Sequence, residues 1–212
     1  MARVATIAEA KKIFGKNFIG PEELAKTGIV RINFKIPMAL FSIETMKKFS
    51  RSHILILGMP KDKTARPLTL NRLRDIFGLD PAVFEPCFYN QDWYLKEDFA
   101  SKKTLDFKWY LIGKGPRPSS RAKAPGEIEK KFKRGEKFPS TILAAFTFFS
   151  YWFITKEILW KHDFIWCEDK DANGDRIYVG RYEDFNKINK NGFNVHRHLS
   201  LRRHFGFVPQ IS

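Results

Sequence analysis

The chain has 212 residues, enough for one domain with a sizeable hydrophobic core. Its apolar fraction of 43% and charged fraction of 29% lie near globular averages and argue against wholesale disorder. Lys and Arg outnumber Asp and Glu by 38 to 23, and the resulting formal charge of +15 makes polyanions the expected partners.

The first residues predict two helices and a strand. Apolar residues recur at helical spacing over 3–14, and Pro21 opens a second helix that Gly28 can end. Residues 29–37 alternate apolar and polar side chains, which is typical of a half-buried strand. The outer face of this strand would be basic.

Three further elements follow in the same part of the chain. Ser42 can cap a short helix that runs through Phe49. The continuous apolar run at 53–60 predicts a strand covered on both faces, and 69–78 has helical spacing. Helices packed on a mixed sheet are therefore expected.

The middle of the chain is less regular. Residues 105–115 predict a strand that ends in a glycine-rich turn. Residues 113–125 are rich in Pro, Gly and Ser and predict a basic loop or linker, followed by a charged helix up to residue 137. This loop is the only candidate boundary, so we interpret 1–212 as a single domain.

The segment 138–155 contains no charged residue and approaches the minimum length of a membrane span. Pro139 and several hydroxyl side chains interrupt it, and Ser140 or Thr141 can cap a helix. We therefore predict a long buried helix near 140–160 and no membrane association.

Two Asn-Gly pairs predict β-hairpins near the C-terminus. Asn173-Gly174 lies between two β-rich arms, and this dipeptide suits a type I′ turn, in which both central residues have positive φ. Residues 191–192 form the second pair. The expected fold class is α+β: one domain with a mixed β-sheet, the long buried helix and C-terminal hairpins.

The acidic residues around the first turn raise the alternative of a calcium loop. Oxygen-bearing side chains match its first positions: Asp169, Asp171, Asn173 and Asp175. The match then fails, because Arg176 replaces an apolar residue and Gly180 replaces the bidentate Glu. A hairpin turn explains the motif without a metal, and no cofactor is expected.

Glu168 and Lys170 follow a β-rich segment and resemble the E-x-K half of a metal-dependent nuclease site. In such a site, carboxylates hold a divalent ion that activates water, so Mg²⁺ would be the cofactor. The fuller pattern needs another acid upstream on a neighbouring strand, whereas Asp163 lies only five residues back in the same segment and Glu157 lies on the predicted helix. A nuclease is therefore an alternative hypothesis, although no catalytic residue is assigned and a protein without enzymatic activity is favoured.

Most of the positive charge lies in two segments. Residues 102–137 contain 12 Lys or Arg and four Asp or Glu, and five Lys or Arg follow Asp184 without any acid. Three of the five histidines lie in the second segment, where the neighbouring arginines favour an anion over a metal ion. Basic segments can follow a phosphate backbone, and neighbouring aromatic rings can stack on unpaired bases. The predicted nucleic-acid contacts are Lys114, Arg117, Arg121, Lys123, Lys130, Lys131, Lys133, Arg134, Arg197, Arg202 and Arg203.

The sequence thus favours a non-catalytic nucleic-acid-binding protein, with DNA and RNA both open, which could belong to a nucleoprotein, phage or mobile-element assembly. No helix-turn-helix, RNP-type strand or zinc module supports sequence-specific readout. A structural or inhibitory protein that binds an acidic protein partner is a further alternative. Cys87 and Cys167 form no CxxC pair, and the N-terminus has no apolar leader, so a cytoplasmic location is expected.

Overall fold

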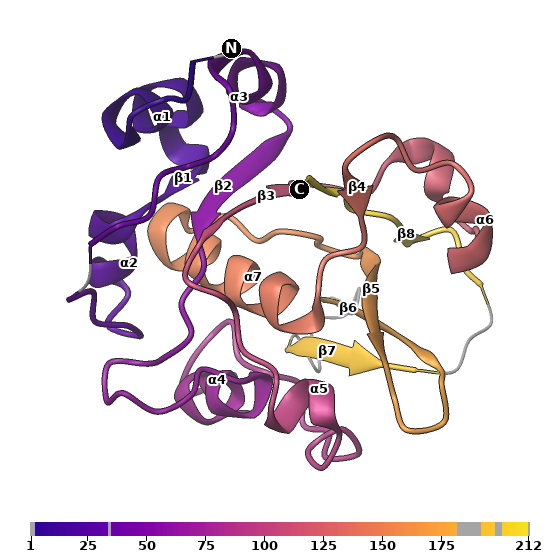
Figure 1. Cartoon of the computed structure of the whole chain (residues 1–212). Helices are drawn as coiled ribbons and strands as arrows, with labels where there is room; N and C mark the ends of the chain where they lie inside the picture. Colours follow the sequence, from indigo (N-terminus) through magenta and orange to yellow (C-terminus); the bar gives the residue numbers. More distant parts are fainter. Residues whose placement is uncertain (1–2, 34, 182–191, 198–200, 212) are drawn as a thin grey trace.

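A computed structural model describes the chain except for residues 1–2, 34, 182–191, 198–200 and 212. The described residues form an α+β fold with two mixed sheets, as Figure 1 shows. One continuous core joins both sheets to the helices. A second, smaller core includes Ile128 of the short helix α6 (Pro125–Glu129). The predicted fold class is confirmed, with two sheets in place of one.

The first sheet has the strand order β1-β2-β3-β9-β4. β1 runs parallel to β2, and the other pairs are antiparallel. All five residues of β2 are buried, as the continuous apolar run predicts. The strands are β1 (Phe18–Ile19), β2 (His53–Leu57), β3 (Trp109–Gly113), β9 (Gln210–Ile211) and β4 (Glu136–Lys137).

The second sheet has the order β7-β6-β5-β8. β8 is parallel to β5, whereas β5, β6 and β7 pair in antiparallel fashion. The strands are β5 (Phe164–Lys170), β6 (Arg176–Arg181), β7 (Phe193–His196) and β8 (Phe205–Gly206).

The first predicted hairpin is confirmed, but its turn is not of type I′, because Gly174 has positive φ and Asn173 does not. The amide of Asp171 donates to the carbonyl of Asp175 at 2.9 Å between the antiparallel strands β5 and β6. Gly174 has φ of +87°, a conformation that glycine adopts without strain. The second predicted turn includes Asn191, which lies outside the described residues; β7, just after it, pairs with β6.

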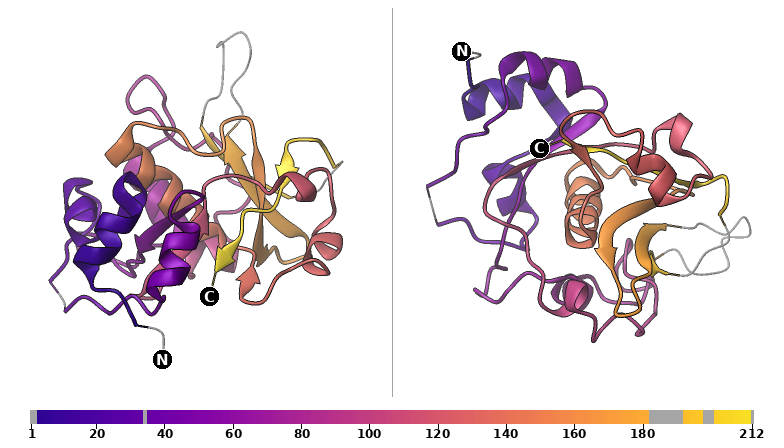
Figure 2. Two further views of the ribbon diagram at one scale, coloured as in Figure 1. Left: turned by 90° about the horizontal axis from the view of Figure 1, so that it is seen from above. Right: turned by 45° about the vertical axis from the view of Figure 1, so that its right-hand side comes forward.

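The predicted central helix is α7 (Thr141–Thr155), which lies between the two sheets in Figures 1 and 2. Ser140 caps it by accepting a hydrogen bond from the amide of Leu143, and every residue from Thr141 to Tyr151 is buried. The absence of charge in this segment therefore reflects burial within the protein. Among the described residues, no helix is both long and apolar enough to cross a membrane.

The other helices surround this centre. Thr6, Ser42 and Thr69 each cap a helix by accepting a backbone amide hydrogen bond. The helices are α1 (Ile7–Phe14), α2 (Pro21–Lys26), α3 (Ile43–Phe49), α4 (Leu70–Phe77), α5 (Asp98–Ser101) and α6 (Pro125–Glu129), with 3₁₀ turns at Gly15–Asn17 and Pro118–Ser120.

The prediction of a strand at 29–37 is wrong, because its described residues form none. Both edges of β2 are already paired, with β1 and β3, so this segment has no place beside β2. Its apolar residues still reach the core: Ile29 and Val30 are buried, and Ile32 is half-buried against it. The alternating pattern therefore reflects partial burial without strand pairing.

The charged helix predicted up to residue 137 is also shorter than expected, because α6 ends at Glu129. The chain turns there and brings Phe132 to 5.1 Å from the ring of Phe138 and 4.8 Å from that of Phe207. The partial burial of the Phe132 ring against the second core favours this turn over a longer helix.

The predicted basic loop at 113–125 is attached to the C-terminal part of the chain. The amides of Arg117 and Ala122 donate to the carbonyls of Phe207 and Phe205 at 2.8 and 3.0 Å. The buried hydroxyl of Ser120 accepts from the amide of Phe207 at 2.8 Å. These bonds hold the loop against β8.

Candidate nucleic-acid interface

Three of the predicted cationic contacts are occupied by ion pairs. Each guanidinium group contacts one carboxylate: Arg117 with Glu136, Arg121 with Asp163, and Arg197 with Asp171. The last two contacts measure 2.5 and 2.8 Å, and Arg197 also lies 4.5 Å from the centroid of the Trp93 ring. These arginines hold loops together, and a phosphate would have to displace a carboxylate to bind them.

A second group of predicted contacts lies on and around α6. Lys130, Lys131, Lys133 and Arg134 are exposed, and Lys123 is half-buried. Within the part of the chain that the structure describes, no carboxylate forms an ion pair with any of them. We call these five residues the basic segment.

Two members of the basic segment lie side by side. The ammonium group of Lys131 beside it lowers the pKa of Lys123, and Glu127 offsets this effect only in part. Two like charges at close range repel each other, and an anion placed between them would relieve the repulsion. The pair is therefore a favourable position for a phosphate.

Two of the three remaining predicted cations extend this surface. Arg202 and Arg203 are exposed just before β8, and the carbonyl of Arg203 accepts from Arg121 at 3.3 Å. This bond places the C-terminal arginines next to the loop that leads into α6. Lys114 lies elsewhere, with its ammonium 5.4 Å from the centroid of the Tyr151 ring.

Two of the three C-terminal histidines, His196 and His204, lie among aromatic rings, and His198 lies outside the described residues. His196 stacks on Tyr178, with ring centroids 5.3 Å apart, and its centroid lies 5.6 Å from that of Phe164. Burial lowers the pKa of His196, and burial together with the charge of Arg202 lowers the pKa of His204. The lowered pKa values favour the neutral form of both rings, which pack against the neighbouring aromatic side chains.

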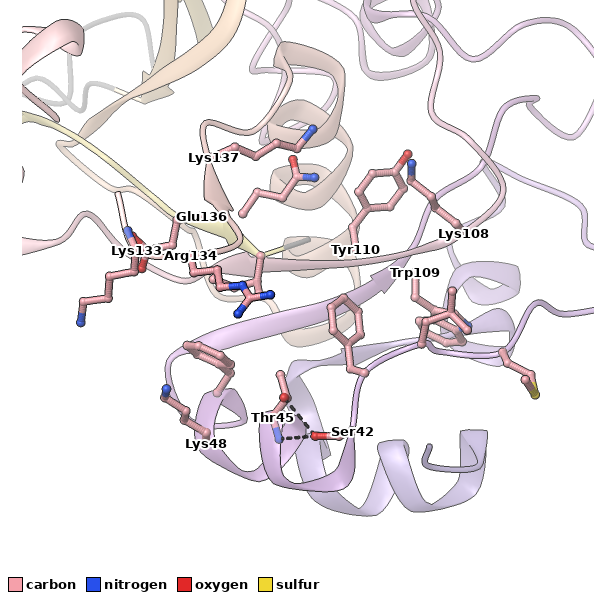
Figure 3. Close-up of a pocket in the computed structure, with 16 residues that line it drawn as sticks. Ser42, Thr45, Lys48, Lys108, Trp109, Tyr110, Lys133, Arg134, Glu136 and Lys137 are labelled. Atoms are coloured by element: carbon pink, nitrogen blue, oxygen red, sulfur yellow. Dashed lines mark hydrogen bonds between the residues drawn. The ribbon is translucent and has the colours of Figure 1, made fainter. Parts of the chain in front are cut away.

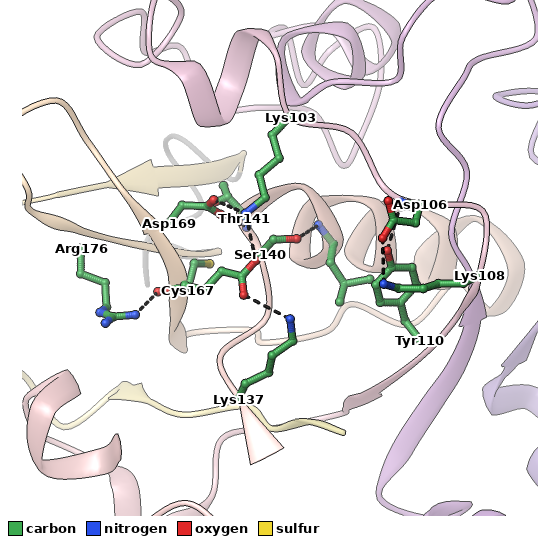
Figure 4. A network of polar contacts seen from close by, with 12 residues as sticks. Lys103, Asp106, Lys108, Tyr110, Lys137, Ser140, Thr141, Cys167, Asp169 and Arg176 are labelled. Atoms are coloured by element: carbon green, nitrogen blue, oxygen red, sulfur yellow. Dashed lines mark hydrogen bonds and ion pairs between the residues drawn. The ribbon is translucent and has the colours of Figure 1, made fainter. Parts of the chain in front are cut away.

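Glu168, the acid of the E-x-K pattern, and its neighbour Asp169 bind lysines in this structure (Figure 4). Lys103 contacts Glu168 at 2.9 Å and Asp169 at 2.7 Å, and Lys137 contacts Glu168 at 3.3 Å. The second oxygen of Asp169 accepts from the amide of Thr141 at 2.6 Å, at the start of α7. Burial raises the pKa of Glu168, but the two lysines more than offset this effect and lower the value.

The other residues of the nuclease hypothesis are not gathered around Glu168. Asp163 pairs with Arg121, and Glu157 pairs with Lys16 at 2.5 Å. Across the described ranges, no group of three or more His, Cys, Asp or Glu side chains is arranged to hold a metal ion. The nuclease stays a prediction, and its test is magnesium-dependent cleavage that Glu168→Ala abolishes.

The residues considered for calcium have other partners. One oxygen of Asp171 accepts from the amides of Asn173 and Asp175, both at 2.9 Å, and the other contacts Arg197. Asp169 binds Lys103 and caps α7. These contacts organise the hairpin turn.

A groove that the sequence did not predict opens on the first sheet between α3 and β4, with a volume of about 610 Å³ (Figure 3). Its apolar lining includes Phe41, Phe49 and Trp109, and the exposed side chains of Met38 and Leu40 border it. We call this feature the sheet groove. It combines residues 38–49, 108–110, 133–137 and 210–211, so no local sequence signal could have found it.

Cations border the sheet groove on two sides. Figure 3 shows Lys48 on the α3 side and Lys133 and Arg134 on the opposite side. None of these three forms an ion pair with a described carboxylate, whereas Lys108 binds Asp106 at 2.7 Å. Lys133 and Arg134 belong to both the basic segment and the groove.

Comparison of the chain with family models, curated proteins and solved structures finds no match.

Proposed function

We propose that the protein binds nucleic acid, DNA or RNA, through the basic segment and without catalysing a reaction. The observation that carries the proposal is the contrast between two sets of neighbouring cations. Arg117 and Arg121 are neutralised by carboxylates, but the five cations of the basic segment have no carboxylate partner among the described residues. A site for a polyanion requires cations of the second kind.

Phosphate binding at this surface has a direct physical basis. Each Lys or Arg that neutralises a phosphate releases condensed counterions, which makes the binding free energy strongly dependent on salt. Lys123 and Lys131 lie close together, and binding of an anion would remove their mutual repulsion. Arg202 and Arg203 would lengthen the contact. The proposal includes a cytoplasmic location, which is supported by two buried cysteines, Cys87 and Cys167, that form no disulfide.

The proposal predicts that replacing Lys130, Lys131, Lys133 and Arg134 together by Ala weakens binding of labelled DNA and RNA. The affinity should fall at least about tenfold near 150 mM salt, and the slope of log affinity against log salt should decrease by roughly 0.7–0.9 for each lost phosphate contact. Fluorescence anisotropy across a salt series measures both quantities.

The matched control replaces by Ala four exposed lysines that lie outside the basic segment, in the N-terminal third of the sequence: Lys12, Lys26, Lys47 and Lys63. It removes the same charge, so it separates a specific surface from a general effect of net charge. An equal loss of binding in this control would contradict the proposal. Binding to nucleic acid that vanishes near physiological salt would also contradict it and direct attention to an acidic protein partner.

A further inference from the structure

The basic segment leads directly into the sheet groove. Lys133 and Arg134 belong to both, and Lys48 adds a positive charge on the other side of the groove. A strand whose phosphates followed the basic segment would therefore be guided to the groove entrance. Because the three cations have no described carboxylate partner, the groove is electrostatically complementary to an anion.

The groove lining is apolar and partly aromatic. Phe41 and Phe49 are half-buried, so part of each side chain remains accessible. The ammonium of Lys48 lies 5.3 Å from the centroid of the Phe49 ring. A base that packed against this ring would have its phosphate within reach of an ammonium group, which is the combination that binders of unpaired strands use.

The apolar residues at the border of the sheet groove also indicate a binding site. Met38 and Leu40 are 70% and 80% exposed, although both are apolar. Exposed apolar side chains next to a groove mark interaction sites. Here they would cover the apolar faces of bases or sugars inside the groove.

The size of the groove selects the form of nucleic acid. A volume of about 610 Å³ is in the range of pockets for small molecules and can hold only a few ring systems. In a duplex the base faces are stacked on each other and only the base edges are accessible. Only an unpaired base can place its face against an aromatic ring in such a groove.

We propose that the sheet groove binds an unpaired segment of nucleic acid, with bases against its apolar lining and phosphates on Lys48, Lys133 and Arg134. This inference rests on the proposed function and adds the substrate class: single-stranded DNA or RNA. An acidic peptide with apolar side chains is the competing occupant, and the pairing of Lys48 with Phe49 favours a nucleotide over it.

The test uses Thr45→Glu, which places a carboxylate in the groove. Thr45 lines the groove at the third position of α3, and Ser42 caps that helix. A Glu at this position after a capping Ser completes a capping box, so the substitution supports the helix. Thr45→Gln is the matched control because it has the same shape and can also complete the capping box, but it carries no charge.

Binding is measured with labelled single strands and with duplexes of equal length, long enough to exceed the site sizes of about 4–16 nucleotides found in single-strand binders. Thr45→Glu should reduce the affinity for single strands about tenfold, the effect of losing roughly one stacked base, and leave duplex affinity within about twofold. Thr45→Gln should retain most single-strand binding. Phe49→Leu keeps an apolar side chain but removes the ring. It should also reduce the affinity for single strands more than the affinity for duplexes.

Any of four outcomes would overturn the inference. Unchanged single-strand affinity in Thr45→Glu, or an equal loss for strands and duplexes, would refute the groove and leave the proposed function intact. If Thr45→Glu weakened the binding of an acidic peptide but left the affinity for single strands unchanged, the groove would be assigned to a protein partner. Failure of the unmodified protein to bind any nucleic acid would refute the proposed function itself.

Discussion

At the residue scale, His53 gives the protein a pH-dependent stability. The residue is 5% exposed at the start of β2, and its ring contacts that of Phe49 at a centroid distance of 4.5 Å. Burial lowers the pKa of His53 to about 4. Its value in the unfolded chain is about 6.5, so between these values the unfolded state binds a proton that the folded state does not bind.

The free energy of unfolding should therefore fall as the pH decreases from about 6.5 towards 4, with a contribution from His53 of about 2 kcal/mol at pH 5. Urea unfolding of the protein and of His53→Gln at pH 7 and pH 5 measures this contribution. The variant should lose less stability than the parent between the two pH values. An identical loss in both proteins would show that His53 does not carry the effect.

Asp169 is a second residue whose role can be tested alone. Its side chain is 5% exposed, and it both contacts Lys103 and caps α7 through the amide of Thr141. Asp169→Ala removes the acceptor of the Thr141 amide, although the Ser140 cap remains, and leaves Lys103 with one carboxylate fewer, so we expect a loss of about 2–3 kcal/mol in the free energy of unfolding.

The control is Asp98→Ala, since Asp98 pairs with Lys102 on the surface, where both side chains are more than 70% exposed. This change should cost less than about 0.5 kcal/mol. Chemical denaturation of both variants measures the difference. Similar losses in the two proteins would argue against a buried role for Asp169.

At the scale of elements, α7 packs its aromatic residues against α4, the loop at Phe88 and the second sheet. Phe149 is fully buried, and its ring centroid lies 4.0 Å from that of Phe77, 4.9 Å from that of Phe88 and 5.6 Å from that of Phe193. Phe149→Ala should lower the free energy of unfolding by about 3–5 kcal/mol, because it leaves a cavity among these rings. Phe153→Ala, at a half-buried position on the same helix, should cost clearly less. Equal costs, measured by thermal or urea unfolding, would contradict the arrangement.

The elements that the sequence predicts well are those with strong local signals. α7, β2 and the hairpin at Asn173-Gly174 all follow from continuous apolar runs, a capping serine and a turn dipeptide. The segment 29–37 has the right alternation but no neighbouring strand. Strand formation requires a pairing partner, and that requirement is not encoded within the segment.

At the scale of the whole molecule, the sequence located the surplus positive charge but could not show which cations are paired with carboxylates. Arg121 and Lys130 look alike in a list of basic residues, yet Arg121 binds Asp163 and Lys130 has no described carboxylate partner. Asp163 lies 42 positions away from Arg121 in the sequence, and only folding brings them together. The same holds for Lys103, which neutralises Glu168 and Asp169 from a distant segment.

The sequence by itself determined the α+β class, the buried central helix, the first hairpin and the polyanion-attracting charge of +15. These features depend on local periodicity, on turn chemistry and on overall composition, all of which can be read from the sequence without knowledge of tertiary contacts. The tertiary structure decided which of the described cations form ion pairs with carboxylates and where Lys48, Lys133 and Arg134 lie around the sheet groove. Those properties depend on contacts between segments far apart in the sequence, and such contacts form only when the chain folds.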